Sequence, residues 1–93
     1  MNITEVSNPS RVYSAAKKIY GNNVMIELSE RKNKKYKLWD PNNKKWIHYG
    51  DSRYEDYTKH NDSERRKDFR TRNAKWADAP LYSPAFASFW TLW

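Results

Sequence analysis

Two histidines are the first side chains to consider for chemistry, because imidazole is the group that titrates near neutral pH. His60 stands two residues before Asp62, as in a catalytic dyad, but no nucleophile or third member follows at a recognisable spacing. His48 alternates with Ile47 and Tyr49, which is typical of an ordinary strand position. A metal site needs further ligands, and the chain contains no cysteine. We therefore predict a protein that is not an enzyme and that has no catalytic residue, metal or cofactor.

The composition argues against several other classes. Gly21 and Gly50 are the only glycines, and neither belongs to a phosphate-binding loop. No apolar run approaches the roughly 20 residues that a membrane-spanning helix needs, and the first residues show no secretory signal. Ninety-three residues can build one small core, so we predict a single domain over residues 1–93 and no membrane partner.

The positive charge is concentrated in one part of the chain. Residues 31–75 hold fifteen basic and seven acidic side chains, whereas residues 1–30 are neutral and residues 76–93 carry one acid. A localised field of one sign favours a polyanionic partner, since lysine neutralises phosphate and arginine binds it bidentately. The alternative is a solvated surface that keeps an aromatic protein soluble. The candidate basic residues are Arg31, Lys32, Lys34, Lys35, Lys44, Lys45, Arg65, Arg66, Arg70 and Arg72.

Aromatic residues lie between these basic ones. Rings on a sheet face can stack with the bases of single-stranded nucleic acid. The same rings can simply form the core of a small protein, and strand alternation directs at least half of them inward, so we favour the core. The set comprises Tyr36, Trp39, Trp46, Tyr49, Tyr54 and Tyr57.

The elements that position these residues follow from local patterns. Asn8-Pro9 begins a helix over 9–20, and Gly21 ends it. Alternating runs at 24–28, 36–39 and 46–49, separated by turn-rich segments, predict an antiparallel meander. A second helix, rich in arginine, is expected to start at Asn61 or Asp62, with Phe69 as the only apolar residue of its charged body over 64–72.

The end of the chain is aromatic. Ser83-Pro84 repeats the helix-start pattern, and the spacing that follows suits one face of a helix. The segment could close the core over the sheet or insert into a neighbouring molecule, where tryptophan is often a dominant contact. The candidate protein-interface residues are Phe86, Phe89, Trp90 and Trp93.

These elements together predict an α+β fold. A small three-stranded antiparallel sheet is expected to be packed by the N-terminal helix and the C-terminal aromatic segment, with the arginine-rich helix at one edge of the sheet.

Several runs of the chain stand out together: Lys45-Trp46-Ile47-His48-Tyr49-Gly50, Tyr54-Glu55-Asp56-Tyr57-Thr58-Lys59-His60, Asp62 with Glu64-Arg65-Arg66, and the ending from Ser83-Pro84 through Leu92-Trp93. They resemble a family of small basic proteins of uncharacterised function that are encoded by large nucleocytoplasmic DNA viruses. The resemblance covers about residues 34–93, with Ser52-Arg53 where the family pattern has a glycine. It implies a viral source and a place in the virion, or in the host cytoplasm at a viral factory, and it carries no catalytic residue.

Within that resemblance, the Tyr54–His60 run is interpreted as a structured loop. Its acids are expected to pair with the arginines that follow, and its tyrosines to pack beneath the hairpin.

The functional expectation is non-enzymatic binding of nucleic acid without sequence specificity, through phosphate neutralisation, with DNA favoured over RNA. The alternative is a minor structural or cement protein of the capsid, whose basic face would meet an acidic capsid surface. The oligomeric state stays open. The predicted nucleic-acid-binding residues are Lys32, Lys34, Lys35, Lys44, Lys45, Arg65, Arg66, Arg70 and Arg72.

Overall fold

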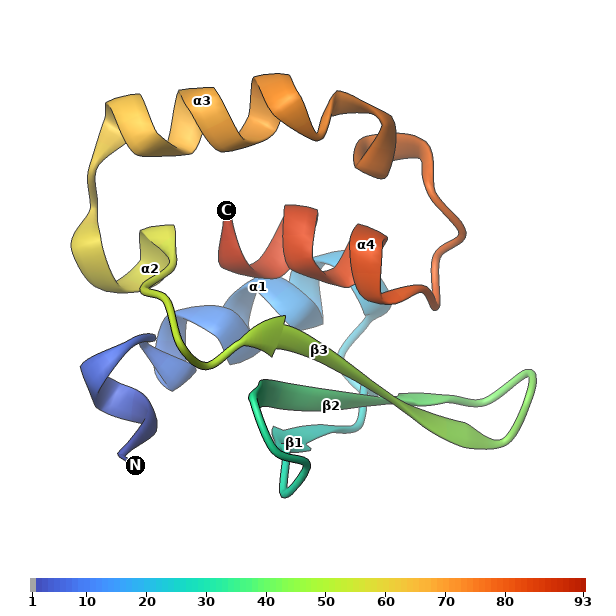
Figure 1. Ribbon diagram of the computed structural model, residues 1–93. Helices are drawn as coiled ribbons and strands as arrows, with labels where there is room; N and C mark the ends of the chain where they lie inside the picture. Colours follow the sequence, from blue (N-terminus) through green and yellow to red (C-terminus); the bar gives the residue numbers. More distant parts are fainter. Residues whose placement is uncertain (1) are drawn as a thin grey trace.

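A three-stranded antiparallel sheet forms one side of the protein, in a computed structural model that describes residues 2–93 (Figure 1). Tyr36 lies opposite Tyr49 in the register, and Trp39 lies opposite Trp46. Because successive side chains point to opposite faces, the two tyrosines enter the core while the two tryptophans occupy the other face. The strands, in their order across the sheet, are β1 (Ile26–Leu28), β2 (Lys34–Asp40) and β3 (Lys45–Asp51).

Helix α1 (Pro9–Tyr20) has the bounds that its sequence pattern predicts. The Asn8 side chain accepts a hydrogen bond from the backbone N–H of Arg11 at 3.3 Å, and Gly21 ends the helix with φ of 98°. Val12 and Ala16 on one face are completely buried. The amphipathic pattern therefore both forms the helix and attaches it to the core.

The core lies between the inner face of the sheet, α1 and the C-terminal segment. That segment consists of α4 (Pro84–Ala87) and a π-helical turn, η3 (Ser88–Leu92). The Thr91 hydroxyl donates to the carbonyl of Ala87 at 2.7 Å, a side-chain bond that competes with the regular helical ladder. Buried side chains from all these elements meet here: Val12, Ala16, Tyr36, Leu38, Ile47, Tyr49, Ala87, Phe89 and Leu92.

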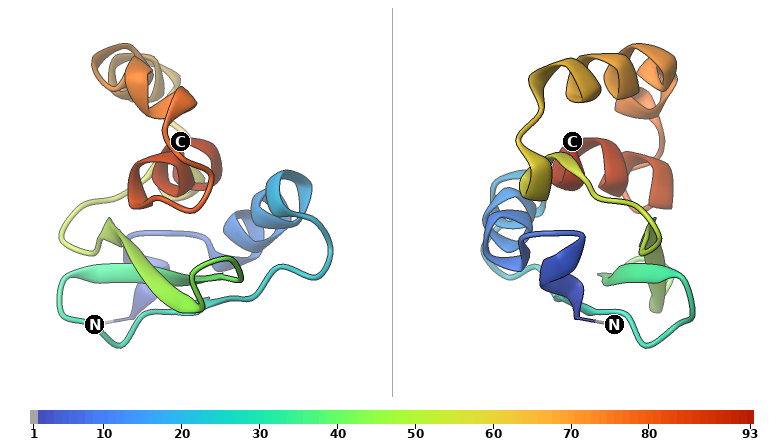
Figure 2. Two further views of the ribbon diagram at one scale, coloured as in Figure 1. Left: turned by 90° about the vertical axis from the view of Figure 1, so that its right-hand side faces the viewer. Right: turned by 60° about the vertical axis from the view of Figure 1, so that its left-hand side comes forward.

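The arginine-rich helix is α3 (Ser63–Arg72), and it begins at the cap residue Asp62. Its position differs from the one predicted at a sheet edge: Figures 1 and 2 show it above the C-terminal segment, which separates it from the sheet. The physical reason is that its apolar residue, Phe69, stacks on Trp93 and not on a strand.

The α+β prediction with a three-stranded antiparallel meander is confirmed. Three short elements were not predicted, because each is too short to show a hydrophobic period. They are η1 (Ile3–Glu5), α2 (Tyr57–His60) and η2 (Ala74–Asp78).

Candidate nucleic-acid interface

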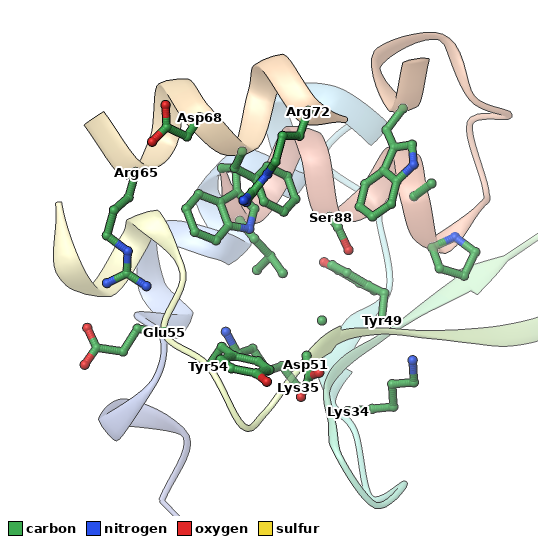
Figure 3. A pocket seen from close by; sticks show the side chains of 17 residues that line it. Lys34, Lys35, Tyr49, Asp51, Tyr54, Glu55, Arg65, Asp68, Arg72 and Ser88 are labelled. Carbon is green, nitrogen blue, oxygen red and sulfur yellow. The ribbon is translucent and has the colours of Figure 1, made fainter. Parts of the chain in front are cut away.

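A half-open cleft of about 760 Å³ lies between α3 and the end of the sheet (Figure 3). Its walls come from the start of β2, the end of β3, the segment before α2, the helix α3, and the turn η2. The C-terminal segment forms the floor. A concave site of this size, mostly apolar and with a few charged groups at its edge, is the usual form of a binding site.

Helix α3 is capped at its start, and one of its rings packs on the C-terminal segment. The Asp62 carboxylate accepts from the backbone N–H groups of Glu64 and Arg65 at 3.0 and 3.1 Å, which caps the helix. The Phe69 ring stacks on the Trp93 indole with centroids 4.3 Å apart and planes at 7°. No residue of α3 is fully buried, so the helix forms a cover over the C-terminal segment and not a part of the core.

Three cations surround the opening of the cleft: Lys34 at the start of β2, and Arg65 and Arg72 on α3. The two arginines are seven residues apart and therefore lie on the same face of the helix. Figure 3 shows their side chains directed from α3 toward the cleft. Within residues 2–93, no ion pair joins any of these three cations to a carboxylate.

Three acids also line the cleft, and they reduce its positive field. Asp51 is engaged by Arg53 through two bonds of 3.0 and 2.8 Å, and this partner lowers the pKa of Asp51 to about 2. Glu55 and Asp68 remain near the opening. The charge of the cleft is therefore positive but small.

Two rings that line the cleft are open to solvent. Tyr54, from the segment between β3 and α2, is 64% exposed, and Trp76 of η2 is 37% exposed. Trp76 also meets Phe69 edge-to-face, with centroids 5.7 Å apart. Trp76 was not among the predicted site residues, although its spacing of seven residues from Phe69 was the available signal.

The prediction that Lys35 binds nucleic acid is wrong. Its side chain is buried, and its Nζ lies 3.0 Å from Oδ2 of Asp56 and 3.3 Å from the carbonyl of Val6. Burial lowers the pKa of Lys35, and the Asp56 carboxylate opposes that effect. Asp56 thus pairs with a lysine of β2, and the expectation that it pairs with the following arginines is also wrong.

The bonds of Asp56 extend into a buried network. Its second carboxylate oxygen accepts from the Thr58 hydroxyl, and the Ser7 hydroxyl bonds to the Tyr36 hydroxyl at 2.7 Å. The Asp56 backbone N–H donates to the carbonyl of Val6 at 3.1 Å. This network joins the segment before α1, the sheet and α2.

Arg66 and Arg70 are used inside the molecule. Both guanidinium groups donate to the main-chain oxygen of Trp93, at 2.6 Å from Arg66 and 3.3 Å from Arg70. Arg70 also covers the Phe89 ring at 4.3 Å. These contacts attach α3 to the C-terminal segment, because the facing surface offers an acceptor and aromatic rings. Both side chains are half-buried, and their role as nucleic-acid-binding residues stays a prediction.

The remaining predicted lysines lie at two other places. Lys32 is in the turn before β2, while Lys44 and Lys45 are at the opposite end of that strand. Seven strand residues separate the two turns by roughly 20 Å. Within residues 2–93, the predicted basic residues therefore do not form one continuous patch. Lys34, Arg65 and Arg72 line the same cleft, together with the buried Lys35.

The aromatic segment packs mostly within its own molecule. Phe89 is 4% exposed, so its prediction as a protein-interface residue is wrong. Trp93 stacks on Phe69, and Phe86 meets Tyr20 edge-to-face at 6.1 Å. Trp90 is 37% exposed, and its indole N–H donates to the carbonyl of Ala77. The role of Trp90 at an interface stays a prediction.

The outer face of the sheet, away from the cleft, carries an aromatic pair of its own. Trp39 and Trp46 meet edge-to-face with centroids 5.3 Å apart, and the Lys37 ammonium lies 4.6 Å above the Trp46 ring. His48 in the same sheet bonds to the Ser29 hydroxyl at 2.7 Å through Nδ1. These rings already contact protein groups on one side, which leaves less of them for a ligand.

Neither a metal cluster nor a membrane span is found in the part of the chain that the structure describes. No group of three or more histidine and acidic side chains there could hold a metal ion. No helix in that part is long and apolar enough to cross a bilayer.

The fold and the cleft define a small basic α+β protein with an aromatic groove beneath a charged helix. Residues 24–73 match DUF5754, a family of unknown function, and because the match covers more than half of the chain the protein belongs to this family. The matched range contains the whole sheet, α2 and α3, whereas α1 and the C-terminal segment lie outside it. Comparisons with curated proteins and with solved structures gave no match.

Proposed function

We propose that this protein binds single-stranded nucleic acid without sequence specificity, with an unpaired base in the cleft and the flanking phosphates on its cationic rim. One observation carries the proposal: basic residues from two distant parts of the chain, Lys34 from the sheet and Arg65 and Arg72 from α3, converge on a cleft that is lined with aromatic rings. Aromatic platforms combined with a positive groove are how proteins hold single strands of any sequence.

The shape of the cleft supports a single strand over a duplex. Tyr54 and Trp76 line the cleft, and a base that enters it to stack on either ring must be free of its own pair. Extracting a base from a duplex costs a few kcal/mol, which a small cationic rim does not offset. The weak net charge of the cleft also argues against a long phosphate interface, because each neutralised phosphate needs its own cation.

The proposal concerns binding and not catalysis. It includes no cofactor and no reaction step; the cleft contributes rings for stacking and cations for phosphate contacts. The resemblance to viral proteins supports a further part of the proposal, that the bound strand belongs to a viral genome or transcript.

Fluorescence anisotropy with labelled single strands and duplexes of the same sequence, at about 50 and 200 mM salt, tests the proposal. We expect the single strand to bind more tightly, with DNA and RNA compared directly. Tyr54→Ala should weaken single-strand binding about tenfold, since stacking of one base contributes about 1–3 kcal/mol. Arg72→Ala should lower the salt slope by about 0.7, the value for one phosphate of a single strand.

Lys67→Ala is the matched control, because Lys67 is an exposed cation of the same helix that does not line the cleft. A preference for duplex would contradict the proposal. So would equal binding by the Tyr54→Ala, Arg72→Ala and Lys67→Ala proteins, since the contacts would then lie elsewhere.

A further inference from the structure

His60 occupies the joint between α2 and α3. Its Nδ1 accepts a hydrogen bond of 2.9 Å from the backbone N–H of Asp62, the cap residue of α3. The ring lies 5.2 Å from the Trp93 indole and 6.1 Å from the Tyr57 ring, measured between centroids. Within residues 2–93, Nε2 of His60 is the one buried side-chain nitrogen or oxygen without a hydrogen-bond partner.

The hydrogen bond at Nδ1 fixes the tautomer and the protonation state of the His60 ring. Because Nδ1 accepts from Asp62, the neutral ring carries its proton on Nε2, which is buried without an acceptor. A protonated ring would carry a second N–H at Nδ1, pointing at the N–H of Asp62. Two donors cannot share one hydrogen bond, so the present joint is compatible only with neutral His60.

The surroundings of His60 both lower and raise its pKa. Burial is the largest effect and lowers its pKa, and Arg65 lowers it further, whereas the nearby carboxylates raise it. Arg66 lies over the Tyr57 ring at 5.0 Å, and Arg11 of α1 lies over the same ring at 5.5 Å. The charged groups near the ring are thus Glu55 and Asp56 before α2, Asp62, Arg65 and Arg66 at the start of α3, and Arg11 from α1.

We propose that His60 is a pH-sensitive latch for the cleft: protonation of its ring breaks the bond to Asp62 and releases the start of α3. The closed state binds the proton less tightly than the released state. Its stability is therefore fully present above the ordinary pKa of histidine, about 6.5, and is lost as the pH falls below that value. Since Arg65 and Phe69 move with α3, the latch also controls single-strand affinity, a consequence that rests on the proposed function.

Hydrogen exchange of the backbone amides, followed by NMR on the full chain without nucleic acid, tests the latch directly. Between pH 7.5 and 5.5, after correction for intrinsic exchange, protection in α3 should fall severalfold more than protection in β2 and β3. The Arg66 amide, which bonds to the carbonyl of Asp62 at 3.0 Å, is the most direct reporter. Unchanged α3 protection over this range would overturn the proposal.

The two histidines provide a matched pair of variants. His60→Asn keeps an acceptor near the position of Nδ1 but does not titrate, so the pH response of α3 should disappear. His48→Asn changes a histidine whose pKa is also lowered by burial but which lies in the sheet, and it should keep the response. A response that persists in His60→Asn contradicts the latch. If His60→Asn does not fold, the ring titration of wild-type His60 decides, because a pKa at or above the ordinary value would exclude the linkage.

Anisotropy at the same two pH values separates the latch from the proposed function. Affinity for a single strand should fall with pH in the wild type but not in His60→Asn. A response of α3 to pH in a protein that binds no strand at pH 7.5 supports the latch and contradicts the proposed function. Binding of a strand at pH 7.5 without any response of α3 to pH supports the proposed function and contradicts the latch.

Discussion

Helices α1 and α3 are of similar length but are attached to the protein in opposite ways. Helix α1 buries Val12 and Ala16 completely, so its own apolar stripe joins it to the sheet and the C-terminal segment. Helix α3 buries no residue fully and is held by the Phe69 stack and by two arginines that reach the Trp93 oxygen.

Because the two helices are attached so differently, we expect this small protein to contain parts of unequal stability. An apolar stripe couples a helix to the global unfolding transition, whereas a few polar and aromatic contacts let a helix open locally at lower free energy. The cleft lies at the border between these two parts, since its floor belongs to the core and one wall is α3. We therefore expect substitutions beneath the sheet to act on the whole molecule and substitutions around α3 to act locally.

The largest effect is expected at the buried ion pair. Asp56→Ala leaves the Lys35 ammonium buried without its partner, which should reduce the free energy of unfolding by about 3–5 kcal/mol. Urea denaturation followed by circular dichroism measures the loss. Asp51→Ala is the control, because its pair with Arg53 is exposed and screened by solvent and so contributes little to stability. Equal losses of unfolding free energy in the two variants would contradict the view that the buried Lys35–Asp56 pair matters for the whole fold.

A smaller and local effect is expected at Arg66. Arg66→Met keeps the length of the side chain but removes the guanidinium that donates to Trp93, which should destabilise α3 by about 1.5–3 kcal/mol. Amide exchange should increase in α3 and stay unchanged in β2. The Lys67→Met protein should behave as wild type. Faster exchange throughout the sheet would contradict the view that α3 opens on its own.

Sequence patterns predicted the part of the fold that depends on neighbours along the chain. The cap at Asn8, the stripe through Val12 and Ala16 and the alternating strands are all local, so α1 and the sheet were found. The site was predicted only in part, because the contacts that separate its cations from the other basic residues involve residues far away in the sequence. No local pattern distinguishes Lys34, which is exposed at the cleft, from Lys35, which is 3% exposed and is paired with a residue 21 positions later.

The arginines of α3 show the same limit. Arg65, Arg66, Arg70 and Arg72 look equivalent in the sequence, and only the helical phase relative to Trp93 divides them into two that face the cleft and two that hold the helix. That phase depends on where the C-terminal segment lies, which a short charged helix does not encode.

The smallest effect is expected at the N-terminal caps of the two helices. Asn8→Ala and Asp62→Ala each remove a side-chain acceptor at a helix start and should cost about 1 kcal/mol. The cost at Asn8 should appear in the urea midpoint of the whole protein, whereas the cost at Asp62 should appear only as faster exchange in α3. The two parts would not be separable if both caps shifted the midpoint equally.

The packing of α1 against η3 has a consequence for how the chain folds during synthesis. The apolar stripe of α1 is complete at residue 20, but the surface that covers it comes from residues 88–92. At a synthesis rate of roughly 5–20 residues per second, the stripe waits several seconds for its partner. During that interval the apolar residues of α1 are exposed, so we expect a nascent chain to be the form of this protein most in need of a chaperone.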